Sequence, residues 1–169
     1  MSLTLKNVLI NLLYYAITLI ALPSLILYAE SYLGIVRHPT TILRAFSILL
    51  GLVGAFLQLW CIALFQSHGR GTPTPALAPE RLVTKGPYAH VRNPMNIGEV
   101  TLFLALALWF ASPILTAYAV LAALAFHLFI VTWEEPEHKR RFGKGYSAYK
   151  AGVNRWIPKP KAWSNSPDQ

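Results

Sequence analysis

Cysteine and charge are both scarce in this chain of 169 residues. It contains a single cysteine, Cys61, and charged residues make up 13% of it. One cysteine excludes a disulfide framework and any zinc site built on cysteines, and we expect no metal site. The charged share is about half that of a soluble domain, and 54% of the residues are hydrophobic. The composition therefore argues against a disordered chain and against an ordinary soluble globule.

Several signature motifs are also missing. The chain has no GxGxxG pattern after a strand, no P-loop, no HExxH and no GxSxG. Their absence excludes Rossmann-type cofactor binding. We also expect no cleavable signal peptide, because the N-terminal apolar run is too long and no A-x-A-like site follows it.

Long apolar runs are what the chain has instead. As helices, the first two would each cover roughly 30 Å, the thickness of a hydrocarbon core. The last two are separated by Ser112 and Pro113, a favourable N-cap followed by a favourable first helical residue, which predicts a tight helical hairpin. We predict an all-α integral membrane protein, one membrane domain over residues 1–169, with about four transmembrane helices. Their expected ranges are 8–29, 45–65, 94–111 and 114–133.

The distribution of basic residues predicts the orientation in the membrane. Thirteen of the fifteen Lys and Arg lie before the first run, between the second and third runs, or after Trp133. The other two, Arg37 and Arg44, lie on the opposite face. The positive-inside rule therefore places both termini and the loop 67–93 in the cytoplasm. The net charge of +8 reflects topology and contact with membrane lipids, which argues against nucleic-acid binding.

The two largest segments outside the membrane are predicted to be ordered. Five prolines fall within residues 67–94, which favours a rigid cover over a floppy tether. The tail 134–160 begins with a helix-start pattern and is expected to form two short helical pieces, broken at Gly143 and Gly145. Its apolar and aromatic stripe fits either a helix on the membrane surface or a lid over a cytoplasmic pocket.

Two ionisable residues lie within the predicted spans. Buried charge in a bilayer is costly, so such residues usually face a partner or a cavity. Glu99 is expected either to cap the first turn of the third helix or to act as a base. His127 is expected either to make an interhelical hydrogen bond, to Gln58 or Thr101, or to act as a base. Small residues spaced by four predict a helix-packing seam: Ser47, Gly51 and Ala55.

A polar cluster is predicted where the third helix begins. Asn93 precedes Pro94, which disfavours helical geometry at Asn93 and makes it the expected N-cap. The free backbone N–H groups of the first turn, with Gly98 allowing close approach, would bind an acidic or polar ligand.

Two adjacent carboxylates, Glu134 and Glu135, follow the fourth helix. The tight hairpin places them next to the third helix. They suit a cationic ligand, or ribose hydroxyls together with an ammonium group. The alternative is that both lie in water and balance Arg140 and Arg141.

Three segments in this region resemble a known family. They are LVTKGPYAHVRNPMNIG at 82–98, EEP at 134–136, and the stretch from FGKGYSAYK to RWIP at 142–158. Together they are similar to the isoprenylcysteine carboxyl methyltransferase family, a group of small membrane methyltransferases that includes phospholipid N-methyltransferases. The resemblance extends from Gly69 to about Pro158, with the segments in the expected order.

The resemblance implies S-adenosyl-L-methionine bound on the cytoplasmic side, in a pocket formed by the loop and the tail. It implies methyl transfer to a lipophilic acceptor that enters from the bilayer. Carried over position by position, the implied cofactor contacts are Leu82, Val83, Tyr88, Asn93, Pro94, Met95, Asn96, Ile97, Gly98, Glu134 and Glu135. If the acceptor is an amine or a thiol, Glu99 and His127 are the candidate bases.

The chain departs from the family pattern at two places. Residues 93–96 read Asn-Pro-Met-Asn where the family usually has His-Pro-x-Tyr. Ile130 stands where the prenylcysteine enzymes place an arginine for the substrate carboxylate, which disfavours carboxyl methylation. Arg92 and Arg155 are the candidates to replace that arginine in binding substrate. The alternative functions are an NADPH-dependent membrane reductase of the sterol-reductase type and a non-catalytic membrane partner protein.

Overall fold

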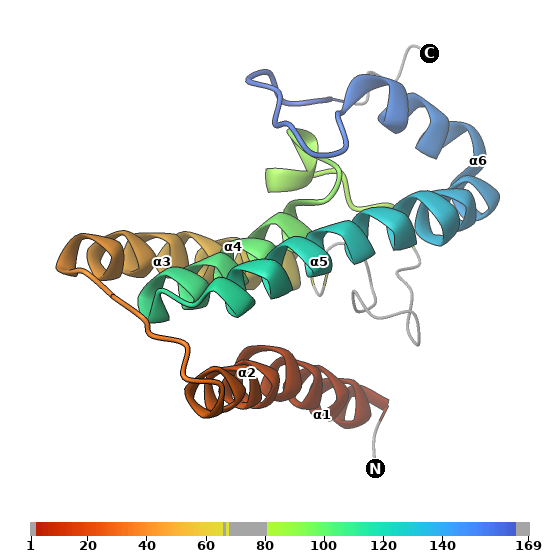
Figure 1. The fold of residues 1–169 in the computed structure, drawn as a ribbon. Coiled ribbons are helices and arrows are strands. Elements are labelled where there is room, and N and C mark those ends of the chain that lie inside the picture. The colour runs from red at the N-terminus through yellow and green to blue at the C-terminus, as the bar shows by residue number, and fades with distance from the viewer. Residues whose placement is uncertain (1–2, 66, 68–80, 165–169) are drawn as a thin grey trace. The chain divides into compact units, whose positions relative to one another are not determined.

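The computed structural model describes residues 3–65, 67 and 81–164, with side chains described from Leu9 onward. Within these residues the chain is helical and forms no strand, which confirms the predicted all-α class. The elements, shown in Figure 1, are α1 (Leu3–Ala16), η1 (Ile17–Ala21), α2 (Leu22–Tyr32), α3 (Thr41–Leu64), η4 (Gly86–Ala89), α4 (Pro94–Phe110), α5 (Pro113–Phe129), η5 (Ile130–Glu134) and α6 (Glu135–Gly152).

The chain divides into two compact units. Unit 1 contains residues 1–56 and 98–123, and unit 2 contains residues 57–97 and 124–169. The helices α3, α4 and α5 each continue from one unit into the other.

The predicted spans are present, with different ends. Among the described residues, three continuous helices are long and apolar enough to cross a membrane, Leu9–Tyr32, Thr41–Leu64 and Pro113–Gly152, and α4 is a shorter apolar helix. The ends expected at residues 29, 45, 65, 111 and 114 differ from the observed ends by one to four residues. The first helix begins at residue 3 and not at residue 8, and the helix expected to end at residue 133 runs on to residue 152. An apolar run marks only the part of a helix that faces hydrocarbon. Backbone hydrogen bonds continue into the flanking polar residues, where side chains such as Glu30 find partners.

Two π-helical turns carry the chain through prolines. A proline lacks an N–H and its ring clashes with the carbonyl four residues earlier, so an α-helix must widen or kink there. The turn η1 ends two residues before Pro23, and η5 ends two residues before Pro136. The expectation that a separate helix starts at residue 134 is therefore wrong, because the π-turn lets α5 run into α6. Within α6 the predicted break occurs at Gly143, which has φ 54°, and not at Gly145.

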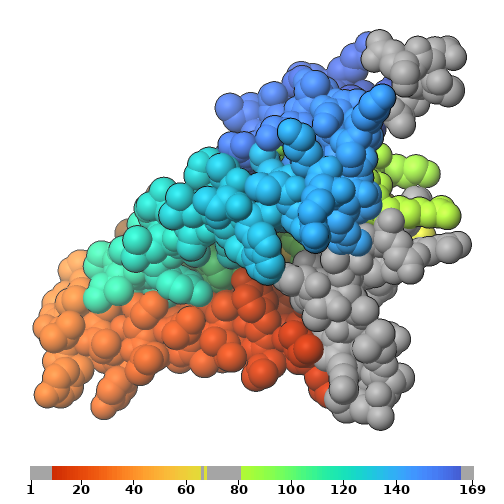
Figure 2. Space-filling model, turned by 90° about the vertical axis from the view of Figure 1, so that its right-hand side faces the viewer, coloured from red at the N-terminus to blue at the C-terminus, as the bar shows by residue number. Residues whose placement is uncertain are grey.

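The helices α1 and α2 present apolar side chains outward. Their surface, red to orange in Figure 2, exposes large side chains such as Leu12, Leu13, Ile20 and Leu25, while in α2 Pro23 and Glu30 are buried. A surface of this kind is unfavourable in water and favourable in hydrocarbon. It agrees with an integral membrane protein.

In unit 1, α3 and α4 approach closely at a glycine. A Cβ atom built on Gly54 would lie 2.8 Å from the backbone oxygen of Gly98 and 3.0 Å from Leu102 Cγ. One built on Gly51 would meet its nearest neighbour, Ala105 Cβ, at 3.8 Å, an ordinary contact. The predicted small-residue seam exists, but Gly54 rather than Ala55 is its tightest point.

The predicted hairpin between α4 and α5 is held by a buried carboxylate. The backbone N–H of Leu115 donates to the Ser112 hydroxyl oxygen at 2.9 Å, which confirms Ser112 as the N-cap of α5. The same hydroxyl donates to Glu30 Oε1 at 2.6 Å, and the N–H of Ile114 donates to that oxygen at 3.0 Å. Glu30 is completely buried and thereby ties the end of α2 to the start of α5.

In unit 2 the tail after α6 pairs with the segment before α4. Val91 and Asn154 form a parallel bridge, and the N–H of Arg92 donates to the Asn154 carbonyl at 2.9 Å. Further along, the N–H of Lys159 donates to His90 O at 2.9 Å and that of Trp163 to Ala89 O at 2.8 Å. The tail is thus held by backbone hydrogen bonds to the segment that precedes α4.

Candidate functional site

A single buried carboxylate, Glu135, lies at the centre of unit 2 and binds three cations. Arg155 donates to it through Nε at 2.6 Å and through Nη2 at 3.1 Å, and Lys150 Nζ donates at 2.7 Å. Arg92 Nη2 lies 3.2 Å from Glu135 Oε1. The Glu135 side chain is 6% exposed and that of Arg92 9%. These four residues, called the charge cluster below, join the first turn of α6 to its last turn, to the tail and to the segment before α4.

The cations determine the protonation of Glu135. Burial by itself would raise the pKa of this carboxyl group. The hydrogen bonds from Arg155 and Lys150, together with the charge of Arg92, outweigh burial and lower the pKa to about 2. Glu135 is therefore ionised at every physiological pH.

This pKa predicts how stability depends on pH. Because the folded pKa of about 2 lies below the ordinary value of 4.5, the contribution of Glu135 is complete above pH 4.5 and is lost as the pH falls toward 2. We expect this contribution to be about 3 kcal/mol. Melting temperatures of the purified protein and of Glu135→Gln, measured from pH 6 to about pH 2, should converge at the acid end. A constant difference between the two across that range would contradict the assignment.

Arg92 has hydrogen-bonding capacity left over. Its Nε and Nη1 atoms are buried and have no hydrogen-bond partner in the described part of the chain. Buried donors of a guanidinium group are rarely left unsatisfied, since each costs about 1–3 kcal/mol or more. Nη2 faces Glu135, so the other two donors are available to an anionic group such as a carboxylate.

The neighbouring Glu134 has a different environment from Glu135. Its side chain is 36% exposed, and its one ion contact among the described residues is His138 Nε2 at 4.0 Å. Burial and the charge of Arg141 lower the pKa of His138, which is therefore neutral at pH 7 and does not compensate the carboxylate. Burial and the charge of Glu135 raise the pKa of Glu134. This carboxylate would gain from a bound cation.

Tyrosines surround these charges. Tyr146 and Tyr149 are buried with Val153, and the tail residue Trp163 packs against them. The Tyr149 hydroxyl donates to Tyr88 O at 2.7 Å, which holds α6 against η4. Burial, with the charge of Glu135, raises the pKa of Tyr146 to about 12 although Arg92 lowers it. The aromatic side chains of the tail therefore pack together next to the charge cluster, and Trp163 is part of this group.

The structure places ten of the eleven predicted cofactor contacts in unit 2, and the eleventh, Gly98, begins the second segment of unit 1. Val83 and Tyr88 pack with Cys61 and Leu64, and Met95 lies against this group. Leu82 packs against the tyrosines of α6. The buried members are Val83, Tyr88, Asn93, Pro94, Gly98 and Glu135, and the partly buried members are Leu82, Met95, Asn96, Ile97 and Glu134.

Asn93 and Arg155 are joined directly. Asn93 Nδ2 donates to the backbone oxygen of Arg155 at 3.1 Å, and α4 begins at the next residue. Arg155 uses Nε and Nη2 on Glu135. The predicted substrate roles of Arg92 and Arg155 stay predictions. Residues 68–80 of the predicted covering loop, with Pro73, Pro75 and Pro79, lie outside the described residues.

The two candidate bases lie in different units. Glu99 is in unit 1 and accepts a hydrogen bond from the Tyr14 hydroxyl at 2.5 Å. His127 is in unit 2 and accepts at Nδ1 from Trp156 Nε1 at 3.0 Å, so the neutral ring carries its proton on Nε2. The hydrogen-bond partner that the structure gives His127 is thus the tail residue Trp156, in place of the expected Gln58 or Thr101. Their catalytic roles stay predictions.

One residue of the charge cluster was not anticipated from the sequence. Lys150 lies in the resembling segment 142–158, yet it was assigned no role. A signal was present, because it follows Glu135 by 15 residues in a helical tail with a glycine at which it can bend. Only the bend at Gly143 brings the end of α6 back to its beginning.

A comparison with protein families decides the class of the molecule. Residues 42–145, more than half of the chain, match the family model described as phospholipid methyltransferase. The chain belongs to the phospholipid methyltransferase family. The matched residues of this family contain α3, the described part of the covering loop, α4, α5 and the acidic pair. No curated protein and no solved structure matches the chain significantly.

Membership of the phospholipid methyltransferase family confirms the predicted resemblance to the wider group of small membrane methyltransferases. It indicates a membrane methyltransferase. Together with the apolar helices it makes the chain an integral membrane protein.

Proposed function

We propose that the protein transfers a methyl group from S-adenosyl-L-methionine to a lipophilic acceptor at the cytoplasmic face of the membrane. The proposal depends on one observation in a chain from a methyltransferase family. Two buried donor atoms of Arg92 in unit 2, Nε and Nη1, have no hydrogen-bond partner among the described residues. Methyltransferases of this type generally use S-adenosyl-L-methionine. When bound, it supplies an electrophilic methyl group on a sulfonium centre.

The residues of unit 2 fit this cofactor. Its methionine part carries a carboxylate and an ammonium group, and the rest carries a sulfonium cation and a ribose. The unpartnered Nε and Nη1 groups of Arg92 lie on different sides of the guanidinium, and either one suits the carboxylate through a charge-assisted hydrogen bond. The uncompensated carboxylate of Glu134 suits the ammonium group or the ribose hydroxyls. The aromatic faces of Tyr88 and Tyr146 suit a cation.

Methyl transfer requires that the donor and acceptor are correctly positioned and that water is excluded. The transfer needs an in-line approach of the acceptor and exclusion of water, and it needs little acid-base help. The tail is bound along residues 89–92 by backbone hydrogen bonds, and Tyr146 and Tyr149, which pack against the tail residue Trp163, are buried. The charge cluster holds this cover in place, so we assign Glu135 to positioning and Glu134 to binding.

The acceptor is proposed to be lipophilic and without a carboxylate to be recognised. Ile130, at the position where the prenylcysteine enzymes have an arginine, is 1% exposed and apolar.

A ligand titration tests the cofactor. The detergent-purified chain is melted with S-adenosyl-L-methionine, S-adenosylhomocysteine or NADPH. A ligand present at about 100 times its dissociation constant adds roughly 2.7 kcal/mol, a readily measured rise in melting temperature. We expect both methionine-derived ligands to stabilise the protein and NADPH to have no effect. Stabilisation by NADPH alone would favour the reductase, and no response to any of the three would favour a non-catalytic protein.

Glu134→Ala separates binding from folding. We expect this variant to lose the stabilisation by S-adenosylhomocysteine, because the carboxylate that compensates the ligand's positive charge is gone. Its melting temperature without ligand should change little, since Glu134 is partly exposed and holds no part of the charge cluster. Glu137→Ala, which removes a carboxylate one turn away that pairs with Arg140, serves as the control. Undiminished ligand stabilisation in Glu134→Ala would refute the assigned role.

A further inference from the structure

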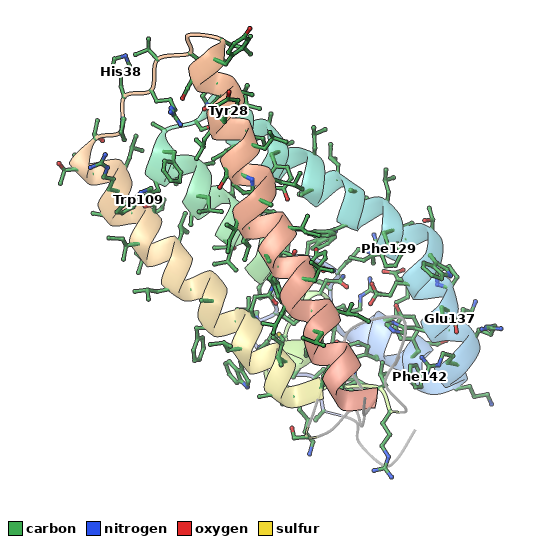
Figure 3. The ribbon with its side chains drawn as sticks, turned by 90° about the horizontal axis from the view of Figure 1, so that it is seen from below. Tyr28, His38, Trp109, Phe129, Glu137 and Phe142 are labelled. Carbon is green, nitrogen blue, oxygen red and sulfur yellow. The ribbon has the colours of Figure 1, made fainter. Side chains whose placement is uncertain are left out.

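Unit 1 contains a cavity of about 520 Å³ where α2 ends and α3 begins. Its lining includes Tyr28 and Ser31 of α2, Arg37 of the connecting segment, Arg44 of α3 and Trp109 of α4. Figure 3 shows Tyr28, His38 and Trp109 at this end of unit 1. The cavity involves none of the candidate cofactor contacts.

The polar part of this cavity is cationic. Arg37 donates through Nη2 to the Ser31 hydroxyl at 3.0 Å, and its Nη1 lies 3.8 Å from Glu30 Oε2. The Arg44 guanidinium lies over the Trp109 ring at 5.6 Å and forms no ion pair with any described carboxylate. The two positive charges of Arg37 and Arg44 thus face the single negative charge of Glu30, so the cavity has one uncompensated positive charge. Guanidinium groups held in this way favour a phosphate.

A second, apolar cavity of about 270 Å³ adjoins the first. It is lined by Leu19 of η1, Ile48 and Gly51 of α3, and Leu102, Leu106 and Trp109 of α4, among others. Trp109 lines both cavities. Gly51 follows Arg44 by seven residues along α3, which is about 10 Å deeper into the membrane. Gly51 and Ala105 are the smallest residues that line this cavity, and a Cβ atom added at Gly51 would lie 3.8 Å from Ala105 Cβ.

We propose that unit 1 binds one glycerophospholipid of the bilayer. Arg37 and Arg44 bind its phosphate, Tyr28 and Trp109 lie at the level of the headgroup, and one acyl chain lies in the apolar cavity beside Gly51. Aromatic side chains prefer this depth. The cationic and aromatic residues line the first cavity and the apolar residues line the second, which matches the headgroup and the acyl chain of a phospholipid. The site is separate from the proposed cofactor site and holds whether or not the cofactor assignment does.

Lipid binding to the detergent-purified full chain tests the proposal. Dioleoylphosphatidylglycerol, dioleoylglycerol and inorganic phosphate are titrated separately, and native mass spectrometry measures the bound fraction. The two lipids share their acyl chains and differ in the phosphate-containing headgroup. We expect the phospholipid to bind at least about tenfold more tightly than dioleoylglycerol, the effect of one charge-assisted contact or more. Equal binding of the two lipids would overturn the proposal, and so would phosphate binding as tightly as the phospholipid.

Variants locate the site. Arg44→Gln should weaken phospholipid binding about tenfold, while Arg140→Gln, at an exposed arginine of unit 2, should leave it unchanged. Gly51→Leu should abolish binding by filling the groove, while Gly51→Ala, whose Cβ meets only an ordinary contact, should retain it. Each variant must keep its response to S-adenosylhomocysteine or its melting temperature, which shows that it is folded. Normal phospholipid binding by both Arg44→Gln and Gly51→Leu would refute the site.

Discussion

Glu135→Gln is expected to lower the free energy of unfolding by about 3–5 kcal/mol, because it breaks a buried ion-pair network. The carboxylate is 6% exposed and binds three cations. Removing its charge leaves the buried guanidinium of Arg92 without a counter-ion, and desolvated charge without compensation is what makes such substitutions costly. Denaturant or thermal unfolding in detergent, followed by circular dichroism, measures the loss.

The matched control for this substitution is Glu137→Gln. Glu137 lies two residues further along α6 and also forms a bidentate pair, with Arg140. The Arg140 side chain is 78% exposed, so water solvates both charges and the pair contributes little to stability. If Glu135→Gln destabilises the protein no more than Glu137→Gln, the charge cluster does not hold the tail over the site.

Gly54→Ala is expected to destabilise unit 1 by about 1–3 kcal/mol, although alanine is the better helix former. The added Cβ would lie 2.8 Å from the Gly98 backbone oxygen, and a backbone atom cannot move aside without separating α3 from α4. The melting temperature in detergent measures the effect. A similar loss is expected in bilayers, because close approach of helix backbones is the main source of attraction between helices there.

Gly51→Ala is the control, since it makes the same substitution one turn earlier on the same helix. Its Cβ would meet its nearest neighbour at 3.8 Å, and the loss of backbone entropy in the unfolded chain makes the substitution neutral or stabilising by up to about 1 kcal/mol. The two substitutions should thus have opposite signs or differ by at least 1 kcal/mol. Equal effects would mean that α3 and α4 are not in contact at Gly54.

The sequence alone predicted the class of the fold and most of its elements. Apolar runs, a single cysteine and the Ser112–Pro113 pair are local features, and each acts through physics that needs no distant partner: burial in hydrocarbon, N-capping and a missing N–H. The π-turns before Pro23 and Pro136 show the limit of this approach. A proline predicts an interrupted helix, but whether the chain stops or widens depends on what packs around it.

The sequence predicted which segments contribute to the candidate site, but not how their side chains are arranged in space. Residues 82–98 and the acidic pair were found because their motifs resemble a family, and the family match over residues 42–145 agrees with this. Which carboxylate of the pair is buried was not predictable. Adjacent residues on a helix point about 100° apart, so one faces inward and one outward, and the choice depends on the neighbours.

The sequence by itself determined that the chain is a membrane protein, where most of its helices lie and which family it resembles. Hydrophobicity, spacing and motifs are properties of the chain and need no tertiary structure. What only the tertiary structure decided is the use of individual charges. Glu135 is structural because the bend at Gly143 returns Lys150 to it, and Glu134 is available because His138 is neutral. Glu30 is buried because a hairpin 82 residues away presents a hydroxyl and an N–H to it. Electrostatic energies depend on distance and burial, and both are set by residues far apart in the chain.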